Sequence, residues 1–445
     1  MAEEPYTPPE LREDALGRAI LVGVDRGGSR DGWSIDESLE ELARLAETAG
    51  IRIVGKVTQR MDKPNPRTFT GAGKAEEIAR LAESLRATQI VFDEDLTPSQ
   101  QYNLEGLIPQ VKLVDRTALI LEIFAMHATS REGKLQVELA QLQYLLPRLR
   151  GMWGHLERER LGGGRGARFG AGESQLETDR RLARKRIGEL KRDLAQVARA
   201  RRTQRAARAA SGVFRVSLVG YTNAGKSSLL NALTGAGALE ADMLFATLDS
   251  TTRRMELPEG RLVTLSDTVG FINKLPHGLV EAFKSTLDEV READLLLHVV
   301  DTAHPQRREQ VRAVSEVLGE IGAAATRQVT VFNKIDVADT EALSRLRARR
   351  PDAVFVSALT GQGLDALAGR VSTEAARDSR TMSLVVPYTR GDIVDAAHAR
   401  AQVVSERHTE HGTEMVVKAP AALSERFAEF ETGGEGGGAG PDGTE

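Results

Sequence analysis

The stretch Phe214-Arg-Val-Ser-Leu-Val219, followed at once by Gly220-Tyr-Thr-Asn-Ala-Gly-Lys-Ser227 and then by Leu229-Leu-Asn-Ala-Leu233, decides the fold of this 445-residue chain. Alternating apolar residues predict a strand over 214–219, and the apolar run after Ser227 predicts a helix. The segment between them has the spacing GxxxxGK[ST], the pattern of a phosphate-binding loop. In that loop the backbone N–H groups and the N-terminus of the helix surround a phosphate. The order strand, loop, helix therefore predicts a doubly wound α/β domain that binds a nucleotide.

Two side chains of this loop have an expected chemical role. Lys226 reaches the β- and γ-phosphate oxygens, and the Ser227 hydroxyl binds Mg²⁺. Taken alone, the eight-residue pattern could also be a glycine-rich turn without a ligand. The strand before it and the helix after it argue against that alternative, because a phosphate loop needs both.

A second element of the site follows a second strand. Leu262-Val-Thr-Leu-Ser266 leads directly into Asp267-Thr-Val-Gly270. An aspartate at a strand end can bind Mg²⁺ through water, and the Gly270 N–H can contact a γ-phosphate. By itself this tetrapeptide is more typical of a loop or a helix cap. Its place after the phosphate loop favours the nucleotide role.

The base-reading element is Asn333-Lys-Ile-Asp336, at the end of the strand Gln328-Val-Thr-Val-Phe-Asn333. Guanine presents N1–H and N2–H₂ as neighbouring donors, and the Asp336 carboxylate can accept both. Adenine lacks this pair and would leave the buried carboxylate unpaired. Ser357-Ala-Leu359 supplies a backbone contact to the guanine oxygen. Together these elements predict a site for GTP and not for ATP.

Composition excludes several other classes of protein. The chain has 41% hydrophobic and 28% charged residues, as ordinary globular proteins do, and it has no cysteine. Disulfides, thiol catalysis and cysteine–zinc sites are therefore excluded, and the eight histidines show no ligand spacing. There is no long apolar run and no secretory signal, so we expect a cytoplasmic protein without stable membrane insertion.

The net charge of −4 hides a strongly basic segment. From Arg148 to Arg208 there are 18 Lys/Arg against 7 Asp/Glu, so this segment carries +11 and the rest of the chain −15. A glycine-rich loop over 161–173 adds Arg165 and Arg168 on a backbone that can approach a phosphate chain closely. Such a block is either a solvated helix face or a polyanion-binding surface. Few aromatic side chains, Trp153 and Phe169, are available for base stacking.

Periodicity divides the chain into domains. Strand-like and helix-like runs alternate before Thr117, which predicts a small parallel-sheet domain. An antiparallel helical hairpin is predicted by leucines at heptad-like spacing over 135–149, a second apolar seam over 187–197 and the glycine-rich loop between them. Pro147 is expected to kink or end its first arm.

The predicted fold class is α/β, with a P-loop GTPase domain preceded by a small α/β domain plus the hairpin and followed by a small α+β domain. The expected bounds are 1–16 for a disordered tail, 17–125 for the N-terminal α/β domain, 126–210 for the helical hairpin with its basic loop, 211–378 for the GTPase (G) domain, 381–431 for the C-terminal α+β domain and 432–445 for a second disordered tail.

Beyond these general elements, the chain resembles the HflX family of ribosome-associated GTPases over roughly Gly17 to Ser357. The matching segments are Phe69-Thr-Gly-Ala-Gly-Lys74, Val114-Asp-Arg-Thr117, Thr129-Ser-Arg-Glu-Gly-Lys-Leu-Gln-Val-Glu-Leu-Ala-Gln-Leu142, Gly172-Glu-Ser-Gln-Leu-Glu-Thr-Asp-Arg-Arg181, Gly220–Ser227, Phe245-Ala-Thr-Leu-Asp249 and Asp267-Thr-Val-Gly-Phe-Ile272. The resemblance implies that Phe245–Asp249 is switch I and that Thr247 is the second protein ligand of Mg²⁺. Without it, Thr251 and Thr252 are equal candidates.

The same resemblance implies a partner. It implies binding to the large ribosomal subunit and its rRNA through the basic hairpin and the N-terminal domain, by a monomeric protein. A role in ribosome splitting and rescue, or in biogenesis under stress, would follow. The region after Arg380 matches only some members of the family, so its role stays open.

The residues expected to bind GTP or GDP are Gly220, Tyr221, Thr222, Asn223, Ala224, Gly225, Lys226, Ser227, Phe245, Ala246, Thr247, Leu248, Asp249, Asp267, Thr268, Val269, Gly270, Asn333, Lys334, Ile335, Asp336, Ser357, Ala358 and Leu359. Lys226, Thr247 and Gly270 are the expected catalytic residues, and Ser227 and Thr247 the expected Mg²⁺ ligands.

Phe271 departs from the pattern of small GTPases. It occupies the position at which many of them have the glutamine that orients the attacking water. A phenyl ring cannot do this, so we expect slow intrinsic hydrolysis, with water positioned by another group or by the partner; this substitution is shared with the resembled family. His277 is a candidate for that role, although a solvent-facing loop residue is the simpler interpretation.

Other interpretations remain at this stage. Gly162–Gly172 and Gly71-Ala-Gly-Lys74 could be further phosphate loops, but neither has the full spacing. The chain could be a signalling module that docks a protein partner through a coiled-coil hairpin. It could also assist RNA modification or ribosome assembly and meet rRNA only during maturation.

Overall fold

The computed structural model describes residues 17–27, 32–149, 171–210, 213–235, 244–245, 247–274, 284–377 and 379–432, and for 171–176, 200–210, 284–286 and 420–422 it describes the backbone alone. Several sequence predictions lie outside these residues. They are the tails 1–16 and 433–445, Ala246, Trp153, His277, and residues 161–170 of the glycine-rich loop with Arg165, Arg168 and Phe169. The last three residues of that predicted loop, 171–173, are helical instead, at the start of the helix Ala171–Ala210.

The N-terminal domain is built on a four-stranded sheet in which every pair is parallel, with strand order β2-β1-β3-β4. The predicted alternation of strands and helices is present. The structure adds two helices that the sequence did not predict: α3, which begins at a capping box formed by Thr97 and Gln100, and α4. The elements are β1 (Arg18–Asp25), α1 (Ile35–Thr48), β2 (Arg52–Arg60), α2 (Ala72–Ser84), β3 (Gln89–Phe92), α3 (Pro98–Leu107), β4 (Lys112–Asp115) and α4 (Arg116–His127).

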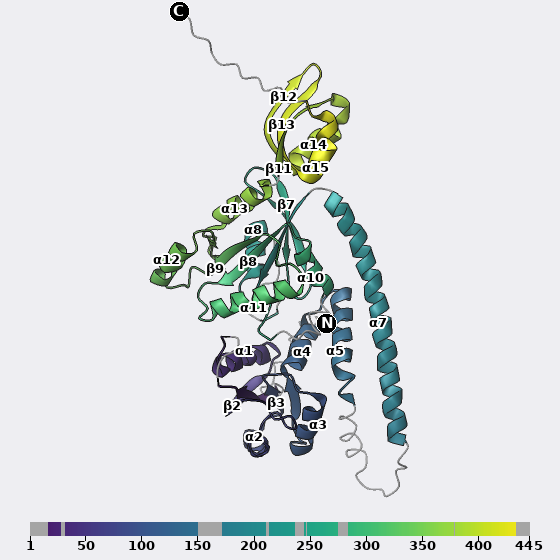
Figure 1. Ribbon diagram of the computed structural model, residues 1–445, viewed down its shortest axis with the longest axis vertical. Coiled ribbons are helices and arrows are strands. Elements are labelled where there is room, and N and C mark those ends of the chain that lie inside the picture. Colours follow the sequence, from purple (N-terminus) through teal and green to yellow (C-terminus); the bar gives the residue numbers. More distant parts are fainter. Residues whose placement is uncertain are drawn as a thin grey trace, which may run out of the picture.

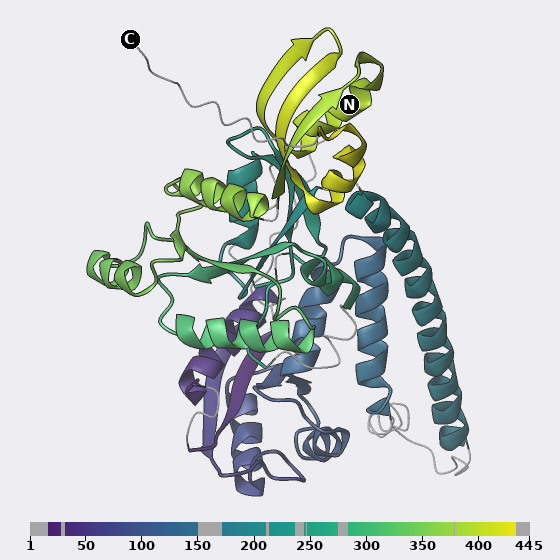
Figure 2. The same cartoon turned by 45° about the horizontal axis from the view of Figure 1, so that its top comes forward.

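Helices α5 (Arg131–Leu145) and α7 (Ala171–Ala210) lie side by side along one flank of the molecule (Figures 1 and 2). Leu190 of α7 is fully buried, and the Arg186 guanidinium donates to both carboxylate oxygens of Glu138 at 2.7 and 2.9 Å. Helix α5 ends two residues before Pro147, as expected.

The G domain has a six-stranded sheet of order β10-β9-β8-β5-β7-β6, in which β6 alone is antiparallel to its neighbour. Helices cover both of its faces, which is the doubly wound arrangement predicted from the phosphate loop. Its elements are β5 (Phe214–Gly220), α8 (Lys226–Thr234), β6 (Thr251–Glu256), β7 (Leu262–Asp267), α10 (Lys284–Arg291), β8 (Leu295–Asp301), α11 (Arg307–Glu320), β9 (Gln328–Asn333), α12 (Thr340–Arg349), β10 (Val354–Phe355) and α13 (Leu364–Ala376).

The C-terminal domain stands at the far end of the G domain from the N-terminal domain (Figure 1). Its antiparallel sheet has the order β11-β13-β12, and it carries two α-helices on one face. Its elements are β11 (Ser379–Val386), α14 (Gly391–Arg400), β12 (Gln402–Thr409), β13 (Gly412–Pro420) and α15 (Ala421–Phe427), with short 3₁₀ turns at Tyr388–Arg390 and Ala428–Phe430. The predicted βαββα order is confirmed.

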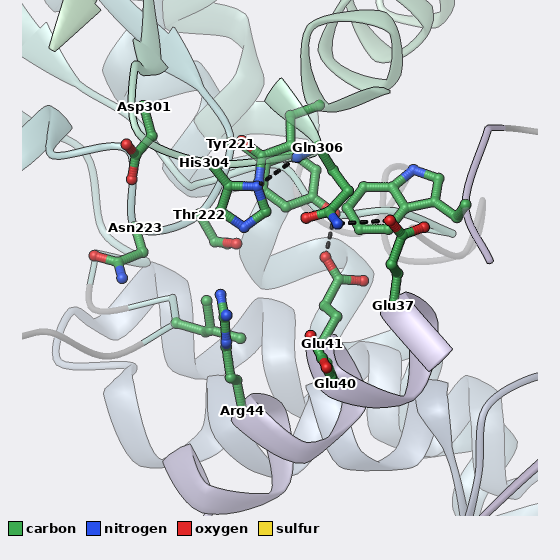
Figure 3. Close-up of a pocket in the computed structure, with 13 residues that line it drawn as sticks. Glu37, Glu40, Glu41, Arg44, Tyr221, Thr222, Asn223, Asp301, His304 and Gln306 are labelled. Carbon is green, nitrogen blue, oxygen red and sulfur yellow. Dashed lines mark hydrogen bonds between the residues drawn. The ribbon is translucent and has the colours of Figure 1, made fainter. Parts of the chain in front are cut away.

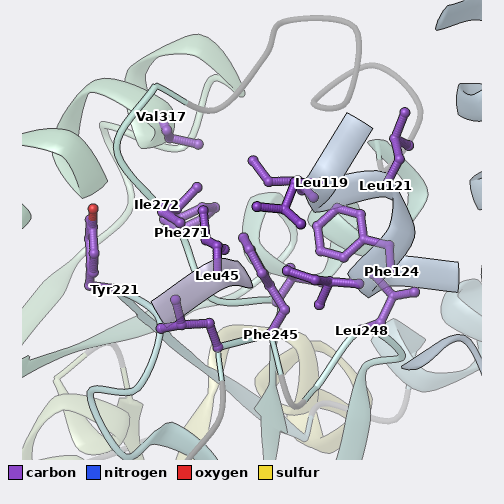
Figure 4. Close-up of a cluster of buried hydrophobic side chains, with 14 of the residues drawn as sticks. Leu45, Leu119, Leu121, Phe124, Tyr221, Phe245, Leu248, Phe271, Ile272 and Val317 are labelled. Atoms are coloured by element: carbon purple, nitrogen blue, oxygen red, sulfur yellow. The ribbon is translucent and has the colours of Figure 1, made fainter. Parts of the chain in front are cut away.

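One hydrophobic core joins the N-terminal domain to the G domain. It includes Leu45 of α1 and Phe124 of α4 together with Phe245, Leu248 and Phe271 of the G domain (Figure 4). The rings of Phe124 and Phe245 meet edge to face at 4.7 Å. The C-terminal domain has a separate core. Within the described residues, no helix is both long and apolar enough to cross a membrane.

Candidate nucleotide-binding site

The phosphate loop connects β5 to α8 with the backbone shape that its sequence requires. Gly225, which caps α8, has φ +86°, and a Cβ atom there would lie 2.3 Å from the Asn333 amide. Gly220 has φ +157°, and a Cβ there would lie 2.3 Å from the Val299 carbonyl oxygen. Both positions therefore need glycine, because any side chain would collide with the neighbouring strand end.

Lys226 is buried at the start of α8, where its ammonium group donates to the carbonyl oxygens of Tyr221 at 2.9 Å and Gly220 at 3.3 Å. Burial lowers the pKa of this lysine to about 8, although the nearby Asp267 carboxylate opposes the shift. A phosphate bound in the loop would give this buried ammonium group a negatively charged partner.

Three oxygen-bearing side chains meet beside the lysine. The Ser227 hydroxyl lies 2.6 Å from Asp267 Oδ2 and 2.8 Å from Thr247 Oγ1, and Thr247 donates to the same carboxylate oxygen at 3.0 Å. Two hydroxyls and a carboxylate are hard oxygen donors, the kind that Mg²⁺ prefers. Thr252, an alternative ligand from the sequence, instead shares a hydrogen bond with Ser266 on β6 and β7.

The turn after β7 lies directly against the phosphate loop. The Thr222 N–H donates to Phe271 at 2.7 Å, and the Phe271 N–H donates to Gly220 at 3.1 Å. A Cβ at Gly270 would lie 2.8 Å from the Thr222 Cα and 3.1 Å from the Lys226 ammonium nitrogen. The Phe271 ring itself is buried in the core shared with the N-terminal domain, away from any attacking water.

The base-reading segments are joined to the loop through Asn333. Its amide donates to the Ala224 carbonyl, and its amide oxygen accepts the Ala358 N–H, each at 3.0 Å. Lys334 pairs with Asp301 at 2.8 Å. Ser357 is buried and Leu359 is 84% exposed. The Asp336 carboxylate is exposed, so the sequence argument was wrong to treat it as already buried; the bound base itself would have to cover it.

The segment expected to be switch I, Phe245–Asp249, makes contacts that the sequence did not predict. Asp249 accepts hydrogen bonds from the Thr129 N–H at 3.0 Å, the Thr129 hydroxyl at 2.7 Å, the Ser130 N–H at 2.7 Å and the Ser130 hydroxyl. Burial raises the pKa of Asp249, but these bonds outweigh burial and hold it below its usual value. Gly133 leaves room for this contact, since a Cβ there would lie 2.5 Å from Asp249 Oδ1. The side chain thus points to the start of α5, and the segment Thr129–Leu142 was the only sequence signal for its partners.

The alternative phosphate loop at Gly71–Lys74 is explained by local structure. Gly71 caps α2, its N–H donates to Gln59 at 2.9 Å, and Lys74 pairs with Glu77 at 2.8 Å. In the other alternative loop, Gly162–Gly172, residues 162–170 lie outside the described residues, and residues 171 and 172 begin α7.

Comparison with known proteins identifies the family. Family models match residues 36–125 (GTP-binding GTPase N-terminal), 127–208 (GTP-binding GTPase Middle Region) and 215–334 (50S ribosome-binding GTPase). The GTPase HflX of Magnetococcus marinus is 46% identical over 422 residues, which are 94% of this chain and 96% of that protein. The chain belongs to the HflX family of GTPases.

A second HflX relative gives the same result. The GTPase HflX of Escherichia coli is 45% identical over 372 residues, covering 82% of this chain and 85% of that protein. A GTP-binding protein of the archaeon Sulfolobus solfataricus, solved with GDP, is similar at 25% identity and a TM-score of 0.40, over 81% of this chain and 99% of the solved one. As an HflX GTPase, the protein hydrolyses GTP to GDP with Mg²⁺ as its metal cofactor.

Proposed function

We propose that this HflX GTPase binds the large ribosomal subunit through its basic hairpin and N-terminal domain, and that the bound nucleotide controls this binding. The observation that carries the proposal is the contact between Asp249 of switch I and the first residues of the hairpin. Switch segments change their order with the γ-phosphate, so a switch that holds α5 can pass the nucleotide state to the hairpin. The family model over residues 215–334, described as a 50S ribosome-binding GTPase, supports the choice of partner.

The hairpin offers a surface suited to rRNA. Arg181, Lys185 and Lys191 of α7 are exposed, whereas Arg186 is occupied by Glu138. Exposed cations along one helix attract phosphates without reading the bases, and such binding weakens steeply as salt rises.

The proposed nucleotide site comprises the residues expected from the sequence. Ser227 and Thr247 hold Mg²⁺ with Asp267 acting through water, Lys226 and the Gly270 N–H contact the γ-phosphate, and Asp336 reads guanine. The convergence of Ser227, Thr247 and Asp267 supports the metal ligands. Leu248 and Phe245 support the site through their buried packing and would not touch the nucleotide with their side chains.

Base specificity has its own test. Replacing Asp336 by Asn removes an acceptor and adds a donor, so GTP affinity should fall at least tenfold relative to that of xanthosine triphosphate, whose base offers an acceptor at that position. Retention of full GTP selectivity in a nucleotide-binding titration would remove Asp336 from the site.

Co-sedimentation with purified ribosomal subunits tests the proposed function. The full chain should pellet with large subunits more strongly with a non-hydrolysable GTP analogue than with GDP, and the binding should fall steeply across a salt series. A triple variant, Arg181→Gln, Lys185→Gln and Lys191→Gln, should bind more weakly and lower the salt slope by about two. The matched control, Arg345→Gln, Arg347→Gln and Arg349→Gln, replaces three exposed arginines of α12 and should bind as the natural protein does.

Other outcomes would overturn the proposal. A chain that stays in the supernatant with every nucleotide is no ribosome-binding protein and would fit a signalling module. Binding only to immature subunits would fit an assembly accessory. Adding the protein with the GTP analogue to intact ribosomes separates the finer roles, because a splitting factor releases free subunits and a factor for biogenesis does not.

A further inference from the structure

One side chain of the phosphate loop points away from the nucleotide and into the N-terminal domain. The Tyr221 ring is 4% exposed and stacks on Trp33, with ring centres 6.2 Å apart. Its hydroxyl donates to the Glu41 carboxylate of α1 (Figure 3). It also accepts the Asn273 N–H at 2.6 Å. A single hydroxyl therefore joins the phosphate loop, the N-terminal domain and the segment three residues after Gly270.

Arg116, the first residue of α4, holds the other side of this junction. Its guanidinium group is 1% exposed and donates to Glu41 at 2.8 Å, to the Asn273 carbonyl at 3.2 Å and to Asp93 at 2.7 Å. Lys274 reaches the same Asp93 carboxylate at 2.7 Å. Arg116 of the N-terminal domain thus pairs with both Glu41 and Asp93, and Lys274 of the G domain pairs with Asp93.

The charges in this network are matched and fully engaged. Burial raises the pKa of Asp93, but the charges of Arg116 and Lys274 outweigh burial and hold it below its usual value. Burial lowers the pKa of Arg116, and the carboxylates of Asp93 and Glu41 more than restore it. Both groups therefore stay charged at neutral pH, and loss of either partner would leave a buried charge uncompensated.

The network is connected to the chemistry by the backbone. Asn273 lies three residues from Gly270, and Gly270 packs against Thr222 and Lys226. Glu41 accepts from the Tyr221 hydroxyl and from Arg116, and each of these two groups in turn bonds to the backbone of Asn273. These bonds fix the distance between the phosphate loop and the turn after β7, residues 268–274, which we call switch II. That distance sets where the Gly270 N–H meets the γ-phosphate, and small displacements there are costly to a phosphoryl-transfer reaction.

We propose that Glu41 and Arg116 are positioning residues of the GTPase site: the N-terminal domain supplies a buried carboxylate–guanidinium pair that holds the phosphate loop, through Tyr221, and switch II, through Asn273, in the arrangement that hydrolyses GTP. Neither residue touches the nucleotide. A G domain with Phe271 has no glutamine to organise switch II from within, and the neighbouring domain does so from outside. This positioning concerns GTP hydrolysis alone and does not depend on the ribosome.

Steady-state and single-turnover GTP hydrolysis by the full chain, without ribosomes, tests this proposal. Tyr221→Phe removes one hydroxyl and keeps the stacked ring; Glu41→Gln removes the charge. Each should lower kcat by roughly tenfold with KM changed less than about twofold, because the network orients switch II and does not bind substrate. The control Glu40→Gln, an exposed carboxylate on the same helix, should leave kcat within about twofold.

A double-mutant cycle separates positioning from general destabilisation. If Tyr221 and Glu41 act through one hydrogen bond, Tyr221→Phe with Glu41→Gln should be no slower than the slower single variant. Multiplicative effects, or single variants as active as Glu40→Gln, would overturn the proposal. So would a loss of activity that follows the folded fraction in thermal melts, since a structural role would remove whole molecules and leave the kcat of the folded ones unchanged.

Discussion

The G domain meets its two neighbours in different ways. On one side, α1 and α4 of the N-terminal domain share a hydrophobic core with switch I and switch II, and the Glu41–Arg116 pair ties that domain to Tyr221. On the other side, the C-terminal domain keeps its own core, and Arg261 donates to Ala375 and Ser379 where the chain passes from α13 into β11. The segments expected to sense the nucleotide therefore share a core with the N-terminal domain and contact the hairpin, whereas the C-terminal domain has a core of its own.

The largest expected difference comes from removing one buried ring on each side. Phe245→Ala should lower the free energy of unfolding by about 3–5 kcal/mol, because it opens a cavity and removes the edge-to-face contact with Phe124. Phe427→Ala should cost a similar amount within the C-terminal domain. GTP hydrolysis should fall with the first and persist with the second, as measured by denaturant titration and activity together. Equal loss of activity in both variants would show that GTP hydrolysis depends on the two neighbours of the G domain to the same extent.

The contact between switch I and α5 can be broken with a matched control. Asp249→Ala leaves the donors of Thr129 and Ser130 without their acceptor, and Asp339→Ala removes the carboxylate that caps α12. Each should cost about 1–2 kcal/mol of stability. Only Asp249→Ala should reduce the preference of large-subunit binding for the GTP analogue over GDP, by about tenfold. If both variants reduce this preference, or if neither does, the contact between switch I and α5 does not pass the nucleotide state to the hairpin.

The buried lysine predicts a pH dependence confined to the nucleotide site. The ammonium group of Lys226 has a pKa of about 8, and a bound phosphate keeps it charged. Binding therefore takes up a proton above this pH, and nucleotide affinity should fall roughly tenfold between pH 7 and 9. Fluorescent-nucleotide titrations should give the same profile for the full chain and for a chain ending at residue 378. A nucleotide affinity that stays constant up to pH 9 would contradict the role of the Lys226 charge in nucleotide binding.

The smallest effect should follow from deleting residues 379–445. Because the C-terminal core is separate, the shortened chain should keep kcat and KM for GTP within about twofold of the full chain. A larger change in steady-state hydrolysis would show that this domain takes part in the switch.

The sequence predicted what local pattern determines. The strand 214–219, the glycines of the phosphate loop and the order of elements in the C-terminal domain follow from periodicity and turn residues, and the structure has them. Helix α3 was missed because its apolar residues do not gather on one face clearly enough to stand out from the polar ones. The fold class could be predicted because each domain repeats a familiar alternation of elements.

Contacts between domains could not be predicted in the same way. Asp249 was expected beside the nucleotide, but its hydrogen-bond partners are 119 and 120 residues away. Tyr221 was expected to line the nucleotide, but its side chain binds Glu41, 180 residues away. Side-chain direction at such positions depends on how domains dock, and periodicity within one segment carries no record of it.

Hydrogen exchange on the full chain tests the central claim most directly, by comparing the bound GTP analogue with bound GDP. If the nucleotide switch is integrated with the N-terminal side, amides in α1 and in the first turn of α5 should exchange several-fold more slowly with the GTP analogue. Amides of β11, β12 and β13 should exchange at the same rate with both nucleotides. A response of the C-terminal strands as large as that of α5, or no response in α5, would contradict the account.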